Sequence, residues 1–212
     1  KRWVVVVDEA HGLVGRVRHA LSPEISTKEI NEALACSETS AAWRGLVARL
    51  SELVRKPFLE SRRYRDGRAL VEMPVLDLRD ILAGCEAHAI TYPPSEPVRI
   101  VVTRLRNFVE HLDWRSRESA DAFVDTSRDV GRITSLGSLC IDPSGWISTQ
   151  IRAFGGCVIL SATLRPEKFF IDNFGIGSLR PRFFDAGTPF PVENQLVLRI
   201  GHISTRYKDR LT

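Results

Sequence analysis

Four consecutive valines, Val4–Val7, lead directly into the two carboxylates Asp8 and Glu9. A β-branched apolar run of this length predicts a strand that is buried on both faces of a parallel sheet. Ligands bind beyond the carboxyl ends of the strands in such sheets. There, one carboxylate can hold Mg²⁺ against nucleotide phosphates while the other orients an attacking water. The alternative is an acidic pair that only ends a core strand.

A second segment, far along the chain, has a related layout. Residues 157–160 form another short apolar run, and Ser161, Ala162 and Thr163 follow it. Hydroxyls in such a place most often form a turn or cap a helix. If both runs are strands of one sheet, however, these hydroxyls can hydrogen-bond to the acidic segment. We therefore expect Glu9 and Thr163 to be neighbours on one sheet.

The length and bulk composition indicate an ordinary globular protein with one large or two small domains. The chain has 212 residues, of which 43% are hydrophobic and 26% charged, as in ordinary globular proteins. Its net charge of +4 permits a nucleic-acid partner without requiring one. No signal peptide or membrane span is visible, so we expect no membrane partner and an intracellular location, either the cytoplasm of a prokaryote or the nucleus of a eukaryote.

The four cysteines Cys36, Cys85, Cys140 and Cys157 are far apart and include no C-x-x-C pair. Their spacing indicates neither a zinc site nor a disulfide framework, and buried reduced thiols are the expectation.

The middle of the chain is predicted to be mostly helical, and strands and helices alternate again towards its end. Apolar spacing and turn residues predict these helices: 12–21, 26–35, 38–56 (ended by Pro57), 75–85, 97–114, 144–154, and one that begins at Pro166 and ends at Gly175. The predicted strands are 122–126, 132–141, 157–160, 181–185 and 195–200.

One basic segment contains a single aromatic residue: Arg62, Arg63, Tyr64, Arg65 and Arg68. Cations of this kind can follow a phosphate backbone while the aromatic ring stacks on a base. A solvated loop with incidental charge explains the pattern equally well.

The two motifs resemble those of a known enzyme family. Asp8-Glu9-Ala10-His11 spells the DEAH form of a Walker B motif, and Ser161-Ala162-Thr163 spells helicase motif III. A long helical insertion between them resembles the XPD/DinG family of superfamily 2 DNA helicases, in which an Arch domain separates motifs II and III. Residues 139–144 and 161–166 also resemble that family, whereas the helical middle agrees only in position and length.

The resemblance implies a fold and a division into domains. The fold is a partial RecA-like parallel sheet of the P-loop NTPase class with a mostly α-helical Arch inserted into it. Residues 1–20 would begin motor domain 1, residues 21–118 would form the Arch, residues 119–180 would resume motor domain 1, and residues 181–212 would lead to motor domain 2.

The resemblance also implies an activity. Members of the family couple ATP hydrolysis to translocation on single-stranded DNA, usually 5′ to 3′, and unwind forked duplexes in DNA repair. Asp8 would bind Mg²⁺, Glu9 would be the catalytic base, and His11 would sense the γ-phosphate side and couple it to motif III. The Arch would guide the strand and could dock regulatory proteins.

Two departures and one absence limit this expectation. Gly12 stands where family members commonly have Asn, and the iron–sulfur cysteines of XPD-type members precede motif II, outside this chain. The sequence contains no G-x-x-x-x-G-K-[ST] loop to cradle the phosphates. We therefore expect a fragment that is not an ATPase by itself.

Two other functions are compatible with parts of the sequence. The chain could be a non-catalytic interaction module built on the Arch. It could also be an unrelated Mg²⁺-dependent phosphohydrolase that uses Asp8 and Glu9, which would require further carboxylates or histidines near Asp8.

Overall fold

The computed structural model describes residues 3–60, 68–118, 120–131, 133–187, 191 and 196. At residues 57–60 and 118 it describes the backbone alone. The chain divides into two compact units, 1–180 and 181–212. The elements, in chain order, are β1 (Val4–Val7), η1 (Ala10–Gly12), α1 (Leu13–Ala20), β2 (Glu24–Ser26), α2 (Thr27–Ala35), α3 (Ala41–Glu60), β3 (Arg68–Leu70), α4 (Val75–Thr91), α5 (Glu96–Glu118), η2 (Ala120–Ala122), β4 (Phe123–Val130), β5 (Ile133–Cys140), α6 (Ser144–Ala153), β6 (Gly156–Ile159), α7 (Glu167–Phe174) and η3 (Gly177–Leu179).

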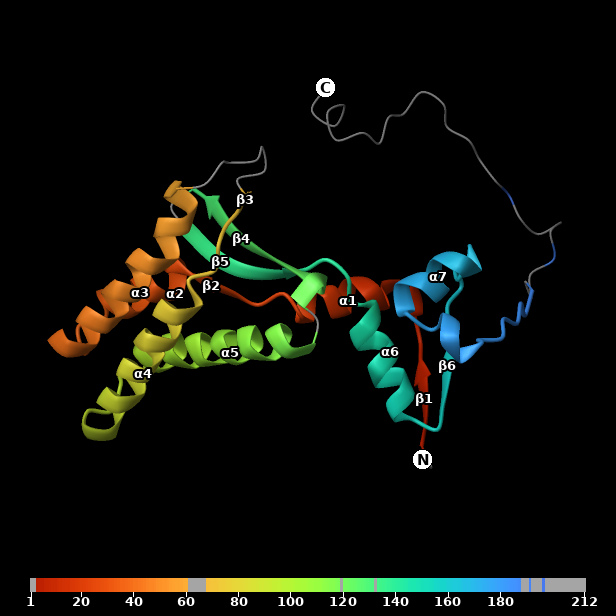
Figure 1. Ribbon diagram of the computed structural model, residues 1–212, viewed down its shortest axis with the longest axis horizontal. Coiled ribbons are helices and arrows are strands. Elements are labelled where there is room, and N and C mark those ends of the chain that lie inside the picture. The colour runs from red at the N-terminus through yellow and green to blue at the C-terminus, as the bar shows by residue number, and fades with distance from the viewer. Residues whose placement is uncertain are drawn as a thin grey trace, which may run out of the picture. The chain divides into compact units, whose positions relative to one another are not determined.

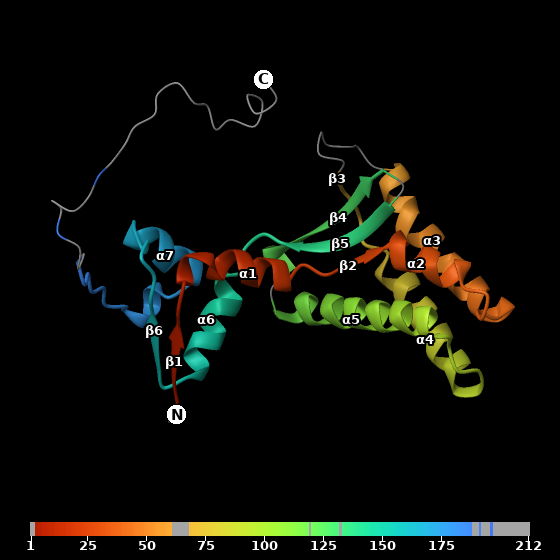
Figure 2. The ribbon, with the colours of Figure 1, turned by 180° about the vertical axis from the view of Figure 1, so that it is seen from behind.

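β1 and β6 lie side by side as a two-stranded parallel sheet (Figures 1 and 2). Their register pairs Val5 with Cys157 and Val7 with Ile159. Helices α1, α6 and α7 cover one face of this sheet, where Val7 and Ile159 pack against a cluster of buried side chains. That cluster contains Ala10, Val17, Ile147, Phe170, Phe174 and Ile176. The predicted α/β class, with parallel pairing of these two runs, is confirmed.

The expectation that Val4–Val7 is buried on both faces is wrong. Val4 and Val6 are 62% and 60% exposed, and Val158, on the same face of β6, is 45% exposed. Successive side chains of a strand point to opposite faces, and the helices named above pack only against the face that carries Val7. A valine run predicts a strand, but burial also depends on what packs against it.

Most of the residues between the two parallel strands, from β2 through β5, form a second body. β2, β5, β4 and β3 make an antiparallel sheet in that order, and α2, α3, α4 and α5 pack with it. Its core includes Ile30, Trp43, Val47, Leu50, Val54, Leu78, Val98, Leu105, Phe108, Leu112 and Leu136. Trp43 is thus a core residue, as its place on the helical face predicts.

The β4–β5 hairpin lies after the domain boundary expected at residue 119, but it packs with the body before that boundary. β5 pairs with β2 and β4 pairs with β3, and Leu136 belongs to the same core as the four helices. By packing, the inserted body therefore runs from β2 through Cys140 and includes a sheet. A short period-two pattern identifies a hairpin but not the sheet to which it adds its edge.

Most predicted helix ends are close to the observed ones. Ser26 is the N-cap of α2, as predicted. Its Oγ accepts the Lys28 N–H at 3.3 Å and donates to the Glu29 carboxylate, so the same two side chains take part as in a capping box but through different hydrogen bonds. The expected stop at Pro57 is wrong, because α3 continues to Glu60. Residues 181–187 contain no strand, and the strand predicted over 195–200 lies outside the described residues except for residue 196.

None of the helices in the described part of the chain is both long and apolar enough to span a bilayer.

Gly175 ends α7 in the left-handed conformation, with φ +65°, as a glycine stop predicts. A Cβ at this position would lie 2.6 Å from the Ser144 carbonyl oxygen. Gly175 therefore permits both the turn and the close approach of α7 to α6.

We expect Gly175→Ala to lower the free energy of unfolding by about 2–4 kcal/mol, because it combines left-handed strain with a backbone clash. Gly131 is the matched control, since it also has a positive φ, +70°, but nothing lies within 4 Å of its Cβ position. Gly131→Ala should cost about 1 kcal/mol. Urea denaturation of both variants measures the difference, and equal costs would contradict the role given to Ser144.

A polar cluster joins α5 to the β4–β5 hairpin. Arg115 forms a 2.5 Å ion pair with Asp125 and donates from Nη1 to Ser138 Oγ at 2.7 Å. Ser138 Oγ lies 3.2 Å from His111 Nε2, so its own hydrogen is available to a neutral imidazole. Burial, and then the charge of Arg115, lowers the pKa of His111 to about 4.

Because the ordinary pKa of histidine is 6.5, the unfolded chain binds a proton on His111 at higher pH than the folded chain does. Folding stability from this group is complete above pH 6.5 and is lost as the pH falls towards 4. Allowing for partial exposure, we expect a loss of about 1–2 kcal/mol by about pH 4.5. Unfolding of the wild type and His111→Gln across this range tests it, and parallel pH profiles would contradict it.

Candidate functional site

The backbones that follow β1 and β6 stay together beyond the last paired residues. The Leu160 N–H donates to the Val7 carbonyl at 2.8 Å, and the Ala10 N–H donates to the Leu160 carbonyl at 3.0 Å. Ala10 is fully buried. These two bonds bring residues 8–11 beside residues 161–163, as the sequence predicts for two strands of one sheet.

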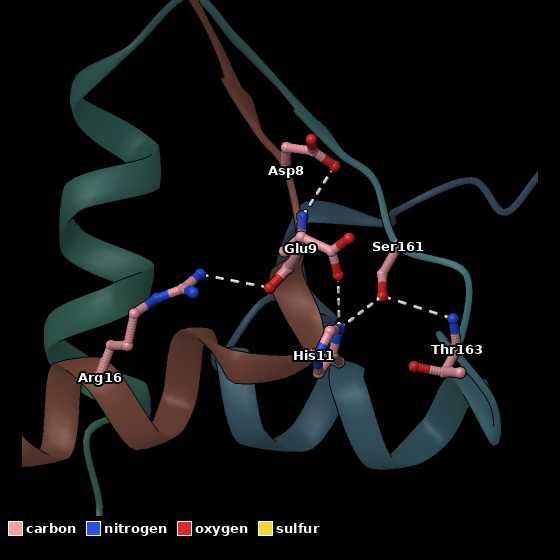
Figure 3. Close-up of polar contacts among 6 residues, drawn as sticks. All are labelled: Asp8, Glu9, His11, Arg16, Ser161 and Thr163. Carbon is pink, nitrogen blue, oxygen red and sulfur yellow. Dashed lines mark hydrogen bonds and ion pairs between the residues drawn. The ribbon is translucent and has the colours of Figure 1, made fainter.

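Glu9 has an unusual backbone conformation, with φ 51° and ψ 43°. This left-handed region costs a non-glycine residue about 1–2 kcal/mol. Polar contacts on both sides of the residue hold it there. Its N–H donates to Asp8 Oδ1 at 2.8 Å, and its carbonyl accepts from Arg16 Nη2 at 3.2 Å (Figure 3). The same carbonyl also accepts from the Gly12 N–H at 3.1 Å. The chain therefore turns sharply at the second carboxylate of the DEAH segment.

His11, the last residue of the DEAH motif, lies between Glu9 and Ser161 of motif III (Figure 3). Its Nδ1 is 3.0 Å from Glu9 Oε2 and also 3.0 Å from Ser161 Oγ. A single ring nitrogen can donate its proton to the carboxylate, share it with the hydroxyl, or, when it carries none, accept from Ser161. The position of one proton on His11 thus determines which motif it binds.

These groups are open to solvent. The side chains of His11 and Glu9 are 52% and 65% exposed. Ion pairs with this exposure contribute little to stability, so they can be rearranged by a ligand at little cost.

Motif III forms a short turn after β6. Ser161 Oγ accepts the Thr163 N–H at 3.3 Å, which fixes the hydroxyl in front of His11. Ala162 and Thr163 are exposed, and no contact with the DEAH segment is observed for the Thr163 hydroxyl among the described residues. Of the three predicted motif III residues, only Ser161 directly contacts the acidic segment through its side chain.

Asp8 has the donor chemistry that Mg²⁺ requires. It is exposed, and among the residues that the structure describes only Oδ1 accepts a hydrogen bond, so Oδ2 can serve as a ligand. Mg²⁺ in nucleotide sites keeps several waters and takes one or two carboxylates plus substrate phosphates. Within the described residues no cluster of three or more His, Cys, Asp or Glu side chains could hold a metal ion alone. Asp8 could supply one carboxylate ligand to such an ion.

The same observation bears on the unrelated phosphohydrolase considered from sequence. That function requires additional carboxylates or histidines converging on Asp8. In the described part of the chain, the groups close to Asp8 are Glu9, whose N–H donates to Asp8 Oδ1, and His11, which contacts Glu9.

The basic segment at 62–68 lies outside the described residues except for Arg68, which begins β3. Its proposed contact with nucleic acid stays a prediction. Conversely, Arg16 contacts the Glu9 backbone although no sequence motif indicates a role for it. No local pattern distinguishes Arg16 from Arg18, because both are arginines on α1 and only the fold shows which carbonyl each reaches.

Comparisons with known proteins found a similarity to a solved structure but no match among family models or curated proteins. A solved structure of an XPD helicase is similar over 84% of this chain, with a TM-score of 0.49 and 14% sequence identity. The chain spans about a third of that helicase, covering 32% of its length.

Proposed function

We propose that this chain forms part of an ATP-dependent DNA helicase of the XPD/DinG type. One observation carries the proposal: His11 Nδ1 lies 3.0 Å from both Glu9 and Ser161. The DEAH and Ser-Ala-Thr segments are 150 residues apart along the chain and meet at the carboxyl edge of one parallel sheet. This is the edge at which ligands bind in such folds.

Each site residue has a role in the proposed reaction. Asp8 would hold a Mg²⁺ ion, which when bound neutralises charge on the transferred phosphoryl group. Glu9 would accept a proton from the attacking water, and its exposed carboxylate is accessible to that water. The β- and γ-phosphates would need a further binding loop, because the sequence contains no Walker A motif.

His11 would connect hydrolysis to motion. When Glu9 takes up the water proton, it becomes a poorer acceptor for the His11 N–H, and the imidazole can then turn to Ser161. The hydroxyl of Ser161 also holds the backbone of Thr163, so a change at His11 reaches the turn after β6. In the proposed helicase, this turn would pass the nucleotide state on to single-stranded DNA.

We expect Glu9→Gln, in the full-length protein to which these residues belong, to lower DNA-stimulated ATP hydrolysis at least about 100-fold, because the amide cannot act as a base. ATP binding should persist. Glu38→Gln is the matched control, since Glu38 is exposed and remote from the site in sequence, and it should keep wild-type hydrolysis.

The rival function, a non-catalytic interaction module, makes the opposite prediction. No nucleic-acid-stimulated hydrolysis by the wild type, or equal rates for Glu9→Gln and Glu38→Gln, would contradict the helicase proposal and leave the interaction module.

We also expect replacement of Arg62, Arg63 and Arg65 by Ala to weaken binding of single-stranded DNA. Fewer phosphates would be neutralised, so the slope of binding against salt concentration should fall as well. Fluorescence anisotropy with a labelled oligonucleotide at several salt concentrations measures both. Unchanged affinity and slope would leave the segment as an ordinary solvated loop.

A further inference from the structure

Arg16 contacts the main chain of Glu9, the candidate catalytic base, and not the Glu9 carboxylate. Nη2 of Arg16 donates to the Glu9 carbonyl at 3.2 Å, while Glu9 Oε2 contacts His11 (Figure 3). In the figure, the guanidinium and the carboxylate lie on opposite sides of the Glu9 backbone. Arg16 therefore leaves the carboxylate free for chemistry while it fixes the peptide from which the carboxylate extends.

The Glu9 peptide needs such support because its conformation is strained. At φ 51° the residue lies in a region that side chains other than glycine seldom adopt, and such residues persist only when their surroundings hold them. The Glu9 carbonyl has two acceptor positions. The Gly12 N–H, which belongs to the turn itself, uses one, and Arg16 uses the other from outside the turn.

Gly12 provides independent support for this role. Its φ of −88° and ψ of −5° are open to any residue, so the turn does not require glycine there. A Cβ at this position would instead lie 3.3 Å from Arg16 Nη1 and 3.6 Å from its Cζ. The guanidinium therefore packs closely over Gly12, and a side chain at position 12 would require it to shift by a few tenths of an ångström.

We propose that Arg16 is a positioning residue for Glu9. Its guanidinium, which packs over Gly12, holds the Glu9 backbone in the left-handed conformation that directs the carboxylate towards His11. The inference rests on the proposed function for the role of Glu9 as a base. Arg16 lies outside both the DEAH and the Ser-Ala-Thr motif, so the proposal adds a residue to the candidate site. Arg16 contacts the main-chain carbonyl of Glu9, while the Glu9 carboxylate contacts His11, so we expect its effect to be on the rate and not on nucleotide binding.

Four variants test the role in the full-length protein. Arg16→Gln should lower kcat for ATP hydrolysis about tenfold with KM for ATP within about twofold, because a small misplacement of a base affects the transition state more than binding. Arg16→Lys should recover part of the rate, since one donor suffices. Gly12→Ala should lower kcat by about threefold by displacing the guanidinium. Arg18→Gln is the matched control, because Arg18 also lies on α1 and donates to a backbone carbonyl, that of Ile141.

A structural measurement separates failure of this inference from failure of the proposed function. In a crystal structure of Arg16→Gln, Glu9 should leave its positive φ and lose its 3.0 Å contact with His11. In a crystal structure of Arg18→Gln, Glu9 should keep both. An unchanged Glu9 in Arg16→Gln overturns the inference, whether or not the protein hydrolyses ATP.

The kinetic results discriminate in the same way. If Glu9→Gln abolishes hydrolysis but Arg16→Gln matches Arg18→Gln, the function stands and the positioning role is wrong. A rise in KM for ATP with unchanged kcat would also overturn the role, because it would make Arg16 a nucleotide-binding residue.

Discussion

The parallel pairing of β1 with β6 is the constraint on which the site depends. The bonds from Leu160 to Val7 and from Ala10 to Leu160 continue the pairing past the strand ends, and they determine which residues of the two loops face each other. A shift of the register by one residue would turn every side chain of a strand to the other face. Ser161 would then no longer meet His11, even if both strands kept their conformations. The large inserted body between the strands has its own core.

At the end of the pairing, the local chemistry depends on a balance of small terms. The left-handed conformation of Glu9 costs about as much as one or two good hydrogen bonds return. The contacts from Asp8, Gly12 and Arg16 offset that cost around the residue. The exposed pair of Glu9 and His11 adds little stability. A site built in this way has a well-defined backbone and adaptable side chains, which suits a base that must change its protonation state and a histidine that must choose between two partners.

Much of this arrangement follows from sequence patterns, and the exceptions have physical reasons. The two apolar runs, the helix from Ser26 and the glycine stop at Gly175 depend on local periodicity and backbone conformation, which neighbouring residues determine. The exposure of Val4 and Val6, the sheet joined by β4 and β5, and the partner of Arg16 depend on long-range packing. Motif spelling selected Asp8, Glu9, His11 and Ser161, which the fold does bring together. It also selected Thr163, which contributes a backbone N–H to the turn and not a side-chain contact with the acidic segment.

Residues 8–11 and 161–163 form one site because they follow two adjacent parallel strands. Backbone NMR of the isotopically labelled chain can test this arrangement. We expect interstrand nuclear Overhauser effects in the register Val5–Cys157 and Val7–Ile159, with slowly exchanging amide protons at Ala10 and Leu160. Missing contacts between the two strands, a shifted register, or rapid exchange at both amides would contradict it, because the DEAH segment would then have no fixed position relative to Ser161.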